Sequence, residues 1–332
     1  MRLRLFSHSR VSPYCEIINT HQGRRVSSPR PDLFKYILIY SMTKELSIAE
    51  QLCYITTRII TMDANKSVHI ATGFFVSFPV EAEDDKFVNV LVTNRHVAED
   101  AEEMIICLNE KDGDNNPIDL SMIQITIADA KSRFIYHPDK NVDLALFLVL
   151  PTIYDAEKSL GKKLFYKSFS ASSIITDEDS MELDAVEDVL MIGYPRGLWD
   201  ERNNRPIIRY GITATDPKVD YCGTREFMID CACIHGSSGS PVLLFYKGVS
   251  CNKYGKETCY DSLKAILLGI QYAIPLRETA GKIVKTNTPT AEKEDTPVIG
   301  LPINLGYIVK AQCLYDFIPL LEKECNLKLK RP

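Results

Sequence analysis

The chain has 332 residues, of which 45% are apolar and 25% are charged, and its net charge is −5. That length and apolar content provide a packed core for one large domain or two small ones, so we expect a globular protein. Residues 1–41 carry seven Arg or Lys against two Asp or Glu, which leaves the rest of the chain acidic. An acidic body argues against a nucleic-acid-binding surface.

The first 41 residues are rich in Arg and Ser and poor in acids. Such a composition is shared by transit peptides, disordered tails and mis-assigned translation starts, and Met42 is a plausible alternative start. The apolar run at 36–40 is too short to span a bilayer, and no secretory signal precedes the ten cysteines. We therefore expect a cytoplasmic protein with reduced thiols and no membrane association.

Residues 42–64 are expected to hold an N-terminal helix and a lead-in. Ser47-Ile48-Ala49-Glu50 reads as a capping box, in which the Ser and Glu side chains would satisfy free backbone N–H groups. Apolar side chains then recur at helical spacing, at Ile48, Leu52, Ile55 and Ile59. We expect this helix to pack on the domain that follows and to have a structural role.

After this helix the pattern changes to short β-branched and aromatic runs separated by turn residues, which is typical of an all-β domain. The first domain is expected over residues 65–153. Its candidate strands are Val68–Phe78, Phe87–Thr93, Met104–Leu108, Met122–Ile127, Arg133–Tyr136 and Leu144–Val149.

A polar, helix-prone connector is expected over residues 154–186, and a second β domain over residues 187–310. Polar stretches at 247–261 and 278–296 interrupt the second domain and read as surface loops. A C-terminal helix and tail are expected over 311–332, with Pro319 as a possible kink. The candidate strands of the second domain are Val189–Gly193, Ile207–Thr213, Glu226–Cys231, Pro241–Phe245, Ala265–Ala273 and Tyr307–Lys310.

Three short motifs carry the chemistry. Ser238 lies between glycines in Gly236-Ser-Ser-Gly-Ser-Pro241, where a tight turn can project its hydroxyl while backbone N–H groups face a reacting carbonyl. His96 follows an apolar strand, and Asp143 precedes another. A serine hydroxyl needs a base such as imidazole, and the imidazole needs a carboxylate to fix its tautomer.

In this His, Asp, Ser order the chain resembles the trypsin-like serine peptidases, which have the chymotrypsin fold. In motif style it is similar to the bacterial high-temperature-requirement branch, but without that branch's appended PDZ domain. Further similar motifs are Ala71–Phe75, Ile192–Leu198, Asp230 eight residues before the nucleophile, and Leu268–Gln271. The resemblance covers about residues 65–310 and implies two six-stranded antiparallel barrels, with helices at both ends.

The resemblance implies a triad of His96, Asp143 and Ser238, with an oxyanion hole made by the backbone N–H groups of Gly236 and Ser238. Each residue also has an ordinary alternative, as a strand-end histidine, a turn cap and a turn serine. Asp139 is a competing acid but lacks an apolar strand behind it, and Ser237 lacks the glycine two before and the glycine one after that Ser238 has. The remaining candidate bases, His69 and His137, are expected at the surface.

Two positions depart from the family's pattern. Ser237 stands where the digestive enzymes have an aspartate that pairs with a newly cut N-terminus, so activation by that ion pair is not expected. Ser240 replaces a common second glycine and makes the turn slightly less permissive. Whether the triad is preassembled or latent is left open, so an activating partner protein is possible.

Substrate-binding residues are carried over from the resemblance. Ala232 would form the base of the primary pocket, His235 would lie at its mouth, and Gly269, Ile270 and Gln271 would belong to the strand along the cleft. Without a carboxylate at the pocket base, a small or medium apolar side chain before the scissile bond is expected. His235 at the mouth would favour an acidic group, or it is simply an exposed loop histidine.

The sequence therefore predicts a serine endopeptidase acting on a protein or peptide substrate through an acyl-enzyme. It needs no cofactor, and no metal site is expected because no paired CxxC motif supplements the cysteines. The alternative is a latent or inactive protease-fold module that binds peptides. An esterase is disfavoured, because such enzymes normally place the nucleophile before the acid and the histidine. The oligomeric state is left open.

Overall fold

The computed structural model describes residues 46–81, 83–260, 263–280 and 298–331. The expected N-terminal extension, residues 1–41, lies outside these residues. Within them, none of the helices has the length and apolar character needed to cross a membrane.

The N-terminal helix is confirmed but is much shorter than its apolar spacing predicts. Helix α2 spans Ile48–Leu52, and the capping box forms, with Ser47 and Glu50 bonding each other's backbone N–H groups. Strand β1 then occupies Thr56–Met62, so Ile59 belongs to a sheet instead of a helix. The β-branched residues from Thr56 onward favour a strand over a continued helix, because such side chains pack well on a pleated surface.

The first half of the fold is a nine-stranded sheet in the order β5-β4-β1-β2-β3-β7-β6, with β8 paired to β4 and β9 paired to β2. Every predicted strand of this half is present, within two residues at most ends. The exception is the start of β3, and β1 and the two short strands of the connector were not predicted as strands. The strands are β1, β2 Val68–Val80, β3 Glu83–Thr93, β4 Glu103–Glu110, β5 Ile123–Ala128, β6 Phe134–Tyr136, β7 Ala145–Leu148, β8 Leu164–Phe165 and β9 Phe169–Ser170.

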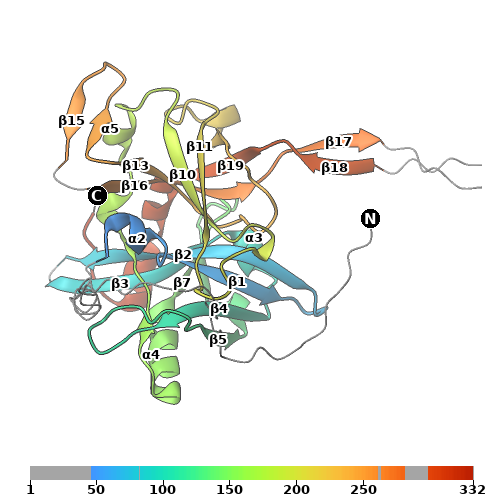
Figure 1. Ribbon diagram of the computed structural model, residues 1–332, viewed down its shortest axis with the longest axis vertical. Coiled ribbons are helices and arrows are strands. Elements are labelled where there is room, and N and C mark those ends of the chain that lie inside the picture. The colour runs from blue at the N-terminus through green and yellow to red at the C-terminus, as the bar shows by residue number, and fades with distance from the viewer. Residues whose placement is uncertain (1–45, 82, 261–262, 281–297, 332) are drawn as a thin grey trace, which may run out of the picture. The chain divides into compact units, whose positions relative to one another are not determined.

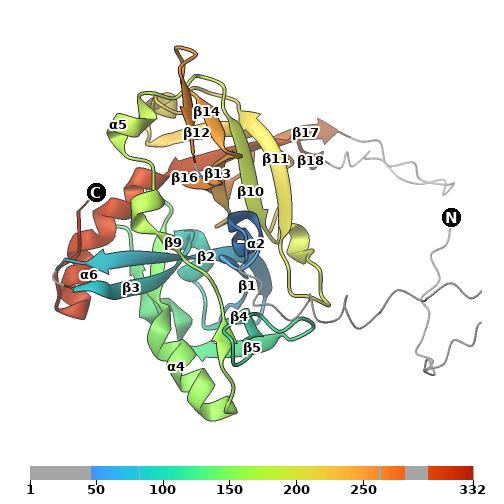
Figure 2. The same ribbon diagram turned by 60° about the vertical axis from the view of Figure 1, so that its left-hand side comes forward.

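This first sheet does not close into the expected barrel. Its two end strands, β5 and β6, are consecutive in the chain, but a 3₁₀ turn, η1 Ala130–Arg133, joins them and no ladder forms between them. Its core face is covered in part by α4 Val149–Leu160, which buries Val149 and Ile153 against the strands. Figures 1 and 2 show α4 on the side of the sheet away from the second half.

The second half is a closed six-stranded barrel in the order β10-β11-β12-β19-β16-β13. Each of the six strands predicted for this domain is one of the six barrel strands. The prediction of two closed barrels is thus met in this half only. The strands are β10 Asp188–Gly193, β11 Ile207–Thr213, β12 Glu226–Asp230, β13 Pro241–Tyr246, β16 Lys264–Ala273 and β19 Leu305–Lys310.

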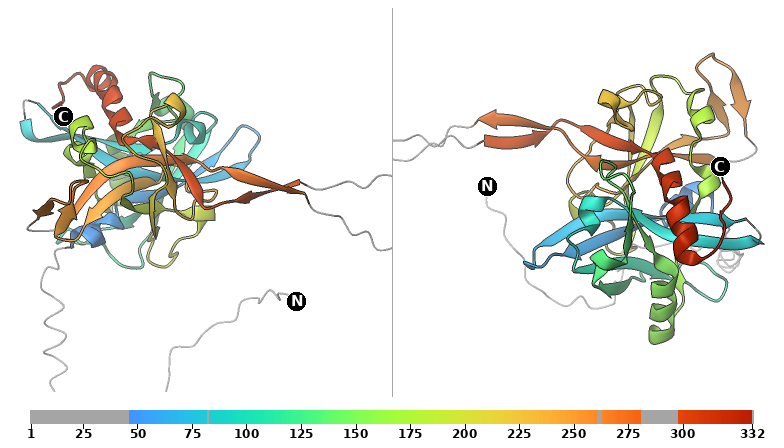
Figure 3. Two further views of the ribbon diagram at one scale, coloured as in Figure 1. Left: turned by 90° about the horizontal axis from the view of Figure 1, so that it is seen from above. Right: turned by 180° about the vertical axis from the view of Figure 1, so that it is seen from behind.

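Two further hairpins were not predicted: the first lies within the loop expected at 247–261, and the strands of the second lie mainly on either side of the loop expected at 278–296. Strands β14 Val249–Cys251 and β15 Glu257–Cys259 pair in the first. Strands β17 Leu276–Ala280 and β18 Val298–Pro302 pair in the second, which extends away from the barrel in Figures 1 and 3. The connector contains β8, β9, the 3₁₀ turn η2 Ala171–Ser173 and the short helix α5 Asp177–Ser180. Because β8 and β9 pair with the first sheet, the connector is partly built into that half.

The C-terminal segment packs at the junction of the two halves. It begins with a 3₁₀ helix, η5 Ala311–Phe317, and continues as α6 Ile318–Cys325. Pro319 lies in the first turn of α6, where its missing N–H costs nothing, so it starts the helix instead of kinking it. Phe317 and Leu321 share one buried cluster with Phe74 of the sheet and Leu243 of the barrel. The right-hand view of Figure 3, seen from behind, shows this segment in front of the strands where the two halves meet.

Candidate active site

His96 and Asp143 lie side by side at the end of the first sheet. His96 belongs to a one-turn helix, α3 Arg95–Ala98, that follows β3. Its Nδ1 lies 2.6 Å from Asp143 Oδ2, and its backbone N–H donates to Asp143 Oδ1 at 3.0 Å. The side-chain amide of Asn94 donates to the Asp143 carbonyl at 2.8 Å, which fixes the start of β7 beside α3. The carboxylate is thus placed to hold the imidazole in one orientation and one tautomer.

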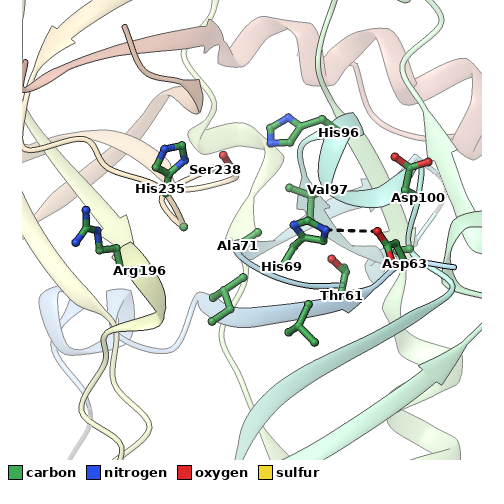
Figure 4. A pocket seen from close by; sticks show the side chains of 14 residues that line it. Thr61, Asp63, His69, Ala71, His96, Val97, Asp100, Arg196, His235 and Ser238 are labelled. Carbon is green, nitrogen blue, oxygen red and sulfur yellow. Dashed lines mark ion pairs between the residues drawn. The ribbon is translucent and has the colours of Figure 1, made fainter. Parts of the chain in front are cut away.

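Ser238 lies on the turn that precedes β13. Its hydroxyl donates a hydrogen bond to the Tyr272 carbonyl at 3.3 Å. Among the described residues its Oγ makes no hydrogen bond to His96, so the Ser–His contact of a triad is not formed in this conformation. In Figure 4 His96 and Ser238 lie at one pocket and come from different segments of the chain.

The two backbone N–H groups expected to form an oxyanion hole are free of acceptors within the described part of the chain. The neighbouring amides already donate hydrogen bonds: the Ser237 N–H donates to the Ile234 carbonyl, and the Gly239 N–H donates to the Gln271 carbonyl. The carbonyl of His235 accepts from Arg196 N–H at 2.6 Å. Gly236 and Ser238 therefore retain two donors at the pocket wall.

Thr72, on β2, ties this turn to the first sheet. Its N–H donates to the Ser238 carbonyl at 2.8 Å, and its hydroxyl donates to the Gly236 carbonyl at 3.2 Å. The same hydroxyl accepts from Tyr194 N–H and from the buried Ser240 hydroxyl. Ser240, at the position of a common glycine, is thus accommodated by a hydrogen bond.

Space for the Ser240 hydroxyl comes from Gly193, since a Cβ built there would lie 2.1 Å from Ser240 Oγ. Ser237, the other departure from the family pattern, is 1% exposed, and its hydroxyl has no partner among the described residues.

A pocket of about 560 Å³ opens between His96 and Ser238. Its walls come from β1, β2, α3, the turn after β10 and the nucleophile turn (Figure 4). Charged side chains stand at its two sides, with Arg196 and His235 beside Ser238 and with Asp63, His69 and Asp100 across from them. Asp63 and His69 pair at 3.8 Å, and the Ser67 N–H, the largest cause, holds the pKa of Asp63 below its ordinary value.

The residues predicted to bind substrate are only partly at this pocket. His235 lines it, while Ala232 is exposed elsewhere and the trio Gly269, Ile270 and Gln271 lies in the barrel wall. Gly269 packs so closely that a Cβ would lie 2.4 Å from Ile308. Gln271 exchanges backbone hydrogen bonds with Gly239 and Ser240, so it supports the nucleophile turn. Substrate binding by Ala232 and by the trio stays a prediction.

Three residues near the site were not found from the sequence. Thr72 and Tyr272 act through a hydroxyl and a main-chain carbonyl, which leave no pattern beyond a polar residue in a strand. Burial, the largest cause, raises the pKa of Tyr272, whose hydroxyl donates to Glu226 at 2.9 Å. Arg196 has a positive φ of 51° within the Ile192–Leu198 motif, which resembles a Gly-x-Pro-x-Gly turn of the family, but its place at the pocket was not predicted.

The expectation that His69 and His137 are surface residues holds for the first and is wrong for the second. The His137 side chain is 1% exposed, and its Nε2 lies 3.1 Å from Asp316 Oδ2. Its ring packs edge-on against Phe317. A histidine that follows a short edge strand is buried here because η5 covers it, which the local sequence does not indicate.

Comparison with known proteins finds one family model that matches the chain. The model of the family described as the trypsin-like peptidase domain matches residues 71–249, more than half of the chain. No match is found among the curated proteins.

Solved structures that resemble the chain include the active form of the Rv3671c protease from M. tuberculosis, HL collagenase and Deg5. Rv3671c is 14% identical, with 96% of each chain covered and a TM-score of 0.37. HL collagenase is 10% identical, with 84% of this chain and 96% of that chain covered and a TM-score of 0.42. Deg5 is 12% identical, with 74% and 88% covered and a TM-score of 0.38.

Proposed function

The chain belongs to the trypsin-like peptidase domain family, and from this premise we propose that it is a serine endopeptidase with Ser238 as nucleophile. The observation that carries the proposal is the His96–Asp143 pair, with Nδ1 and Oδ2 2.6 Å apart, at the pocket that Ser238 also lines. A carboxylate in this position stabilises the imidazolium that forms when His96 accepts a proton.

In the proposed reaction Ser238 Oγ attacks the carbonyl carbon of the scissile peptide bond while His96 takes the hydroxyl proton. For this step the hydroxyl turns from the Tyr272 carbonyl toward His96, a rotation about one side-chain bond. The carbonyl oxygen becomes an oxyanion, which the free N–H groups of Gly236 and Ser238 stabilise. Hydrogen bonds between catalytic groups are often long before substrate binds.

Collapse of this intermediate breaks the C–N bond, and His96 gives its proton to the leaving amine. The acyl group remains on Ser238 as an ester. Water then attacks the ester carbonyl, with its proton passing to His96, and the ester bond breaks to release the acid and restore the Ser238 hydroxyl. Apart from the substrate and one water molecule, each step needs only the side chains and amides of this site.

A fluorophosphonate probe tests the proposal, because it phosphonylates only a serine that an adjacent base activates. We expect the intact mass of the parent protein to increase by one probe adduct and that of Ser238→Ala to stay unchanged. Ser237→Ala is the matched control, since its neighbouring hydroxyl is buried and should not be needed for labelling.

If the parent protein is not labelled while it remains folded, the proposal is overturned in favour of a peptide-binding module. That alternative keeps the pocket and predicts peptide affinity without turnover. Ser238 bonded to Tyr272 instead of His96 is the feature that the alternative would use.

A further inference from the structure

The pocket next to Ser238 carries unpaired charges of both signs. Arg196 is exposed, and its guanidinium makes no hydrogen bond or ion pair to any residue that the structure describes. Asp100, on the other side, is likewise exposed and has no ion-pair partner within the described ranges. His235 adds a second basic group beside Arg196. Asp63, which pairs with His69, adds a second carboxylate beside Asp100 (Figure 4).

The backbone of Arg196 is held in a conformation that side-chain-bearing residues avoid. Arg196 and Gly197 have φ of 51° and 72°, and Leu198 N–H closes the turn on Pro195. A left-handed conformation is unfavourable for a residue with a Cβ, because the Cβ comes too close to the following carbonyl oxygen. Glycine or asparagine would fit this turn with less strain. Strain of this kind concentrates at functional sites, and here it presents a guanidinium at the pocket wall.

The pocket lies on one side of Ser238, and β16 lies on the other. Ser238 bonds to Tyr272 of β16, yet neither Gln271 nor Tyr272 lines the pocket. If the segment before the scissile bond, which forms the acyl-enzyme, runs along β16, the segment after the bond, which leaves as an amine, can bind in the pocket. This step rests on the proposed function.

We propose that the pocket selects substrates by the charges that follow the scissile bond. An acidic side chain at the first position meets Arg196 and His235 on the wall that carries Ser238. A basic side chain at the third position meets Asp63 and Asp100 on the far wall. The two positions are two residues apart, or about 7 Å along an extended chain. The substrate class is thus a protein segment with this order of charges.

Four peptides that are identical before the scissile bond test the proposed order of charges. They carry Ala-Ala-Ala, Glu-Ala-Ala, Glu-Ala-Lys or Lys-Ala-Glu after the scissile bond. We expect kcat/KM to rise about threefold to fivefold for each correctly placed charge, so that Glu-Ala-Lys is about ninefold to 25-fold better than Ala-Ala-Ala. Lys-Ala-Glu has the same composition and should be no better than Ala-Ala-Ala. Equal rates for the two charged orders would overturn the proposal.

Variants test which wall recognises which charge. Each variant is judged by the ratio of kcat/KM between two peptides, because a general loss of rate cancels in that ratio. Arg196→Asn keeps a residue suited to the left-handed turn and should abolish the advantage of Glu-Ala-Ala over Ala-Ala-Ala. Arg196→Glu should invert that advantage. The double variant Asp63→Asn with Asp100→Asn should remove the advantage of Glu-Ala-Lys over Glu-Ala-Ala. It should leave the advantage of Glu-Ala-Ala over Ala-Ala-Ala unchanged. Unchanged ratios in these variants would contradict the assignment.

Binding of the leaving halves to Ser238→Ala separates this inference from the proposed function. Labelled Glu-Ala-Lys and Lys-Ala-Glu peptides are titrated and followed by fluorescence anisotropy at low salt, where such charges are least screened. A preference for Glu-Ala-Lys supports the inference even if the parent protein is not labelled by the fluorophosphonate. Equal binding of both orders overturns the inference even if Ser238 is labelled.

Discussion

The backbone N–H of Arg196 donates a 2.6 Å hydrogen bond to the carbonyl of His235, whose peptide group also carries the Gly236 N–H. In a planar trans peptide the carbonyl and the N–H point in opposite directions. The contact therefore aims the Gly236 N–H away from the Arg196 backbone. Gly236 has a φ of +87°, and a Cβ there would lie 2.7 Å from Arg196 N and 2.8 Å from the Tyr194 carbonyl.

Gly236→Ala should therefore lose activity through the orientation of one N–H group. The added methyl would push the nucleophile turn away from Arg196 and release the peptide group. Loss of one oxyanion donor lowers kcat about 10²- to 10³-fold. Gly248→Ala is the matched control, since Gly248 has a φ of +92° and open space around its Cβ. Steady-state kinetics on one peptide should show the loss in the first variant only, and equal losses in both would refute the role of Gly236.

Asp143→Asn should leave the fold intact and reduce turnover. The asparagine amide cannot stabilise the imidazolium, and it favours the wrong tautomer of His96. The expected fall in kcat is on the order of 10³- to 10⁴-fold. Asp139→Asn provides the comparison, because among the described residues its carboxylate accepts a hydrogen bond only from the Asn141 N–H of a polar turn. A larger loss in Asp139→Asn than in Asp143→Asn would reassign the acid.

Asp316→Ala should destabilise the protein, because this carboxylate joins the two halves. It contacts His137 of the first half and Arg225 beside the barrel. Removing it leaves the buried imidazole without its partner, at a cost of about 1–3 kcal/mol in the free energy of unfolding. Glu102→Ala breaks an ion pair with Lys131 whose side chains are 41% and 43% exposed, and should cost about 0.5 kcal/mol. Urea unfolding of both variants measures the difference, and similar midpoints would contradict it.

Thiol reactivity should follow burial. Burial, the largest cause, raises the pKa of Cys313 to about 12, so the reactive thiolate is scarce at pH 8. Cys251 and Cys259 are free and exposed. Iodoacetamide at pH 8 should modify these two within minutes and spare Cys313 until the protein unfolds, as read by peptide mass spectrometry. Modification of Cys313 at the rate of Cys251 in the native protein would show that η5 opens readily.

The barrel strands were well predicted from local pattern, and β1 was not. Each barrel strand is an apolar run bounded by turn residues, so both its periodicity and its ends can be predicted from the local sequence. Around β1 the apolar residues Leu52, Ile55 and Ile59 keep helical spacing although the helix ends at Leu52. The strand forms because β2 and β4 pair with it on both sides, and pairing across the chain is absent from local periodicity.

The candidate triad was predicted from motif order, whereas the pocket beside it was not. His96 and Asp143 meet because β3 and β7 are antiparallel neighbours, a relation that the resemblance to a family implies. The pocket, in contrast, combines the β1–β2 turn with the turn after β10. Arg196 and Asp63 therefore share a site only through the packing of the sheet on the barrel.

The C-terminal segment also has a consequence for the order in which this protein can fold during synthesis. Leu329 bridges to Val80 at the end of β2, and Lys330 N–H donates to the Pro79 carbonyl. Phe317 and Leu321 fill the core between sheet and barrel. The first sheet is translated early but keeps part of its apolar surface open until these residues emerge from the ribosome. A chaperone that shields this surface would therefore act before residue 311 is made, and peptidase activity would follow synthesis of the segment that completes the core.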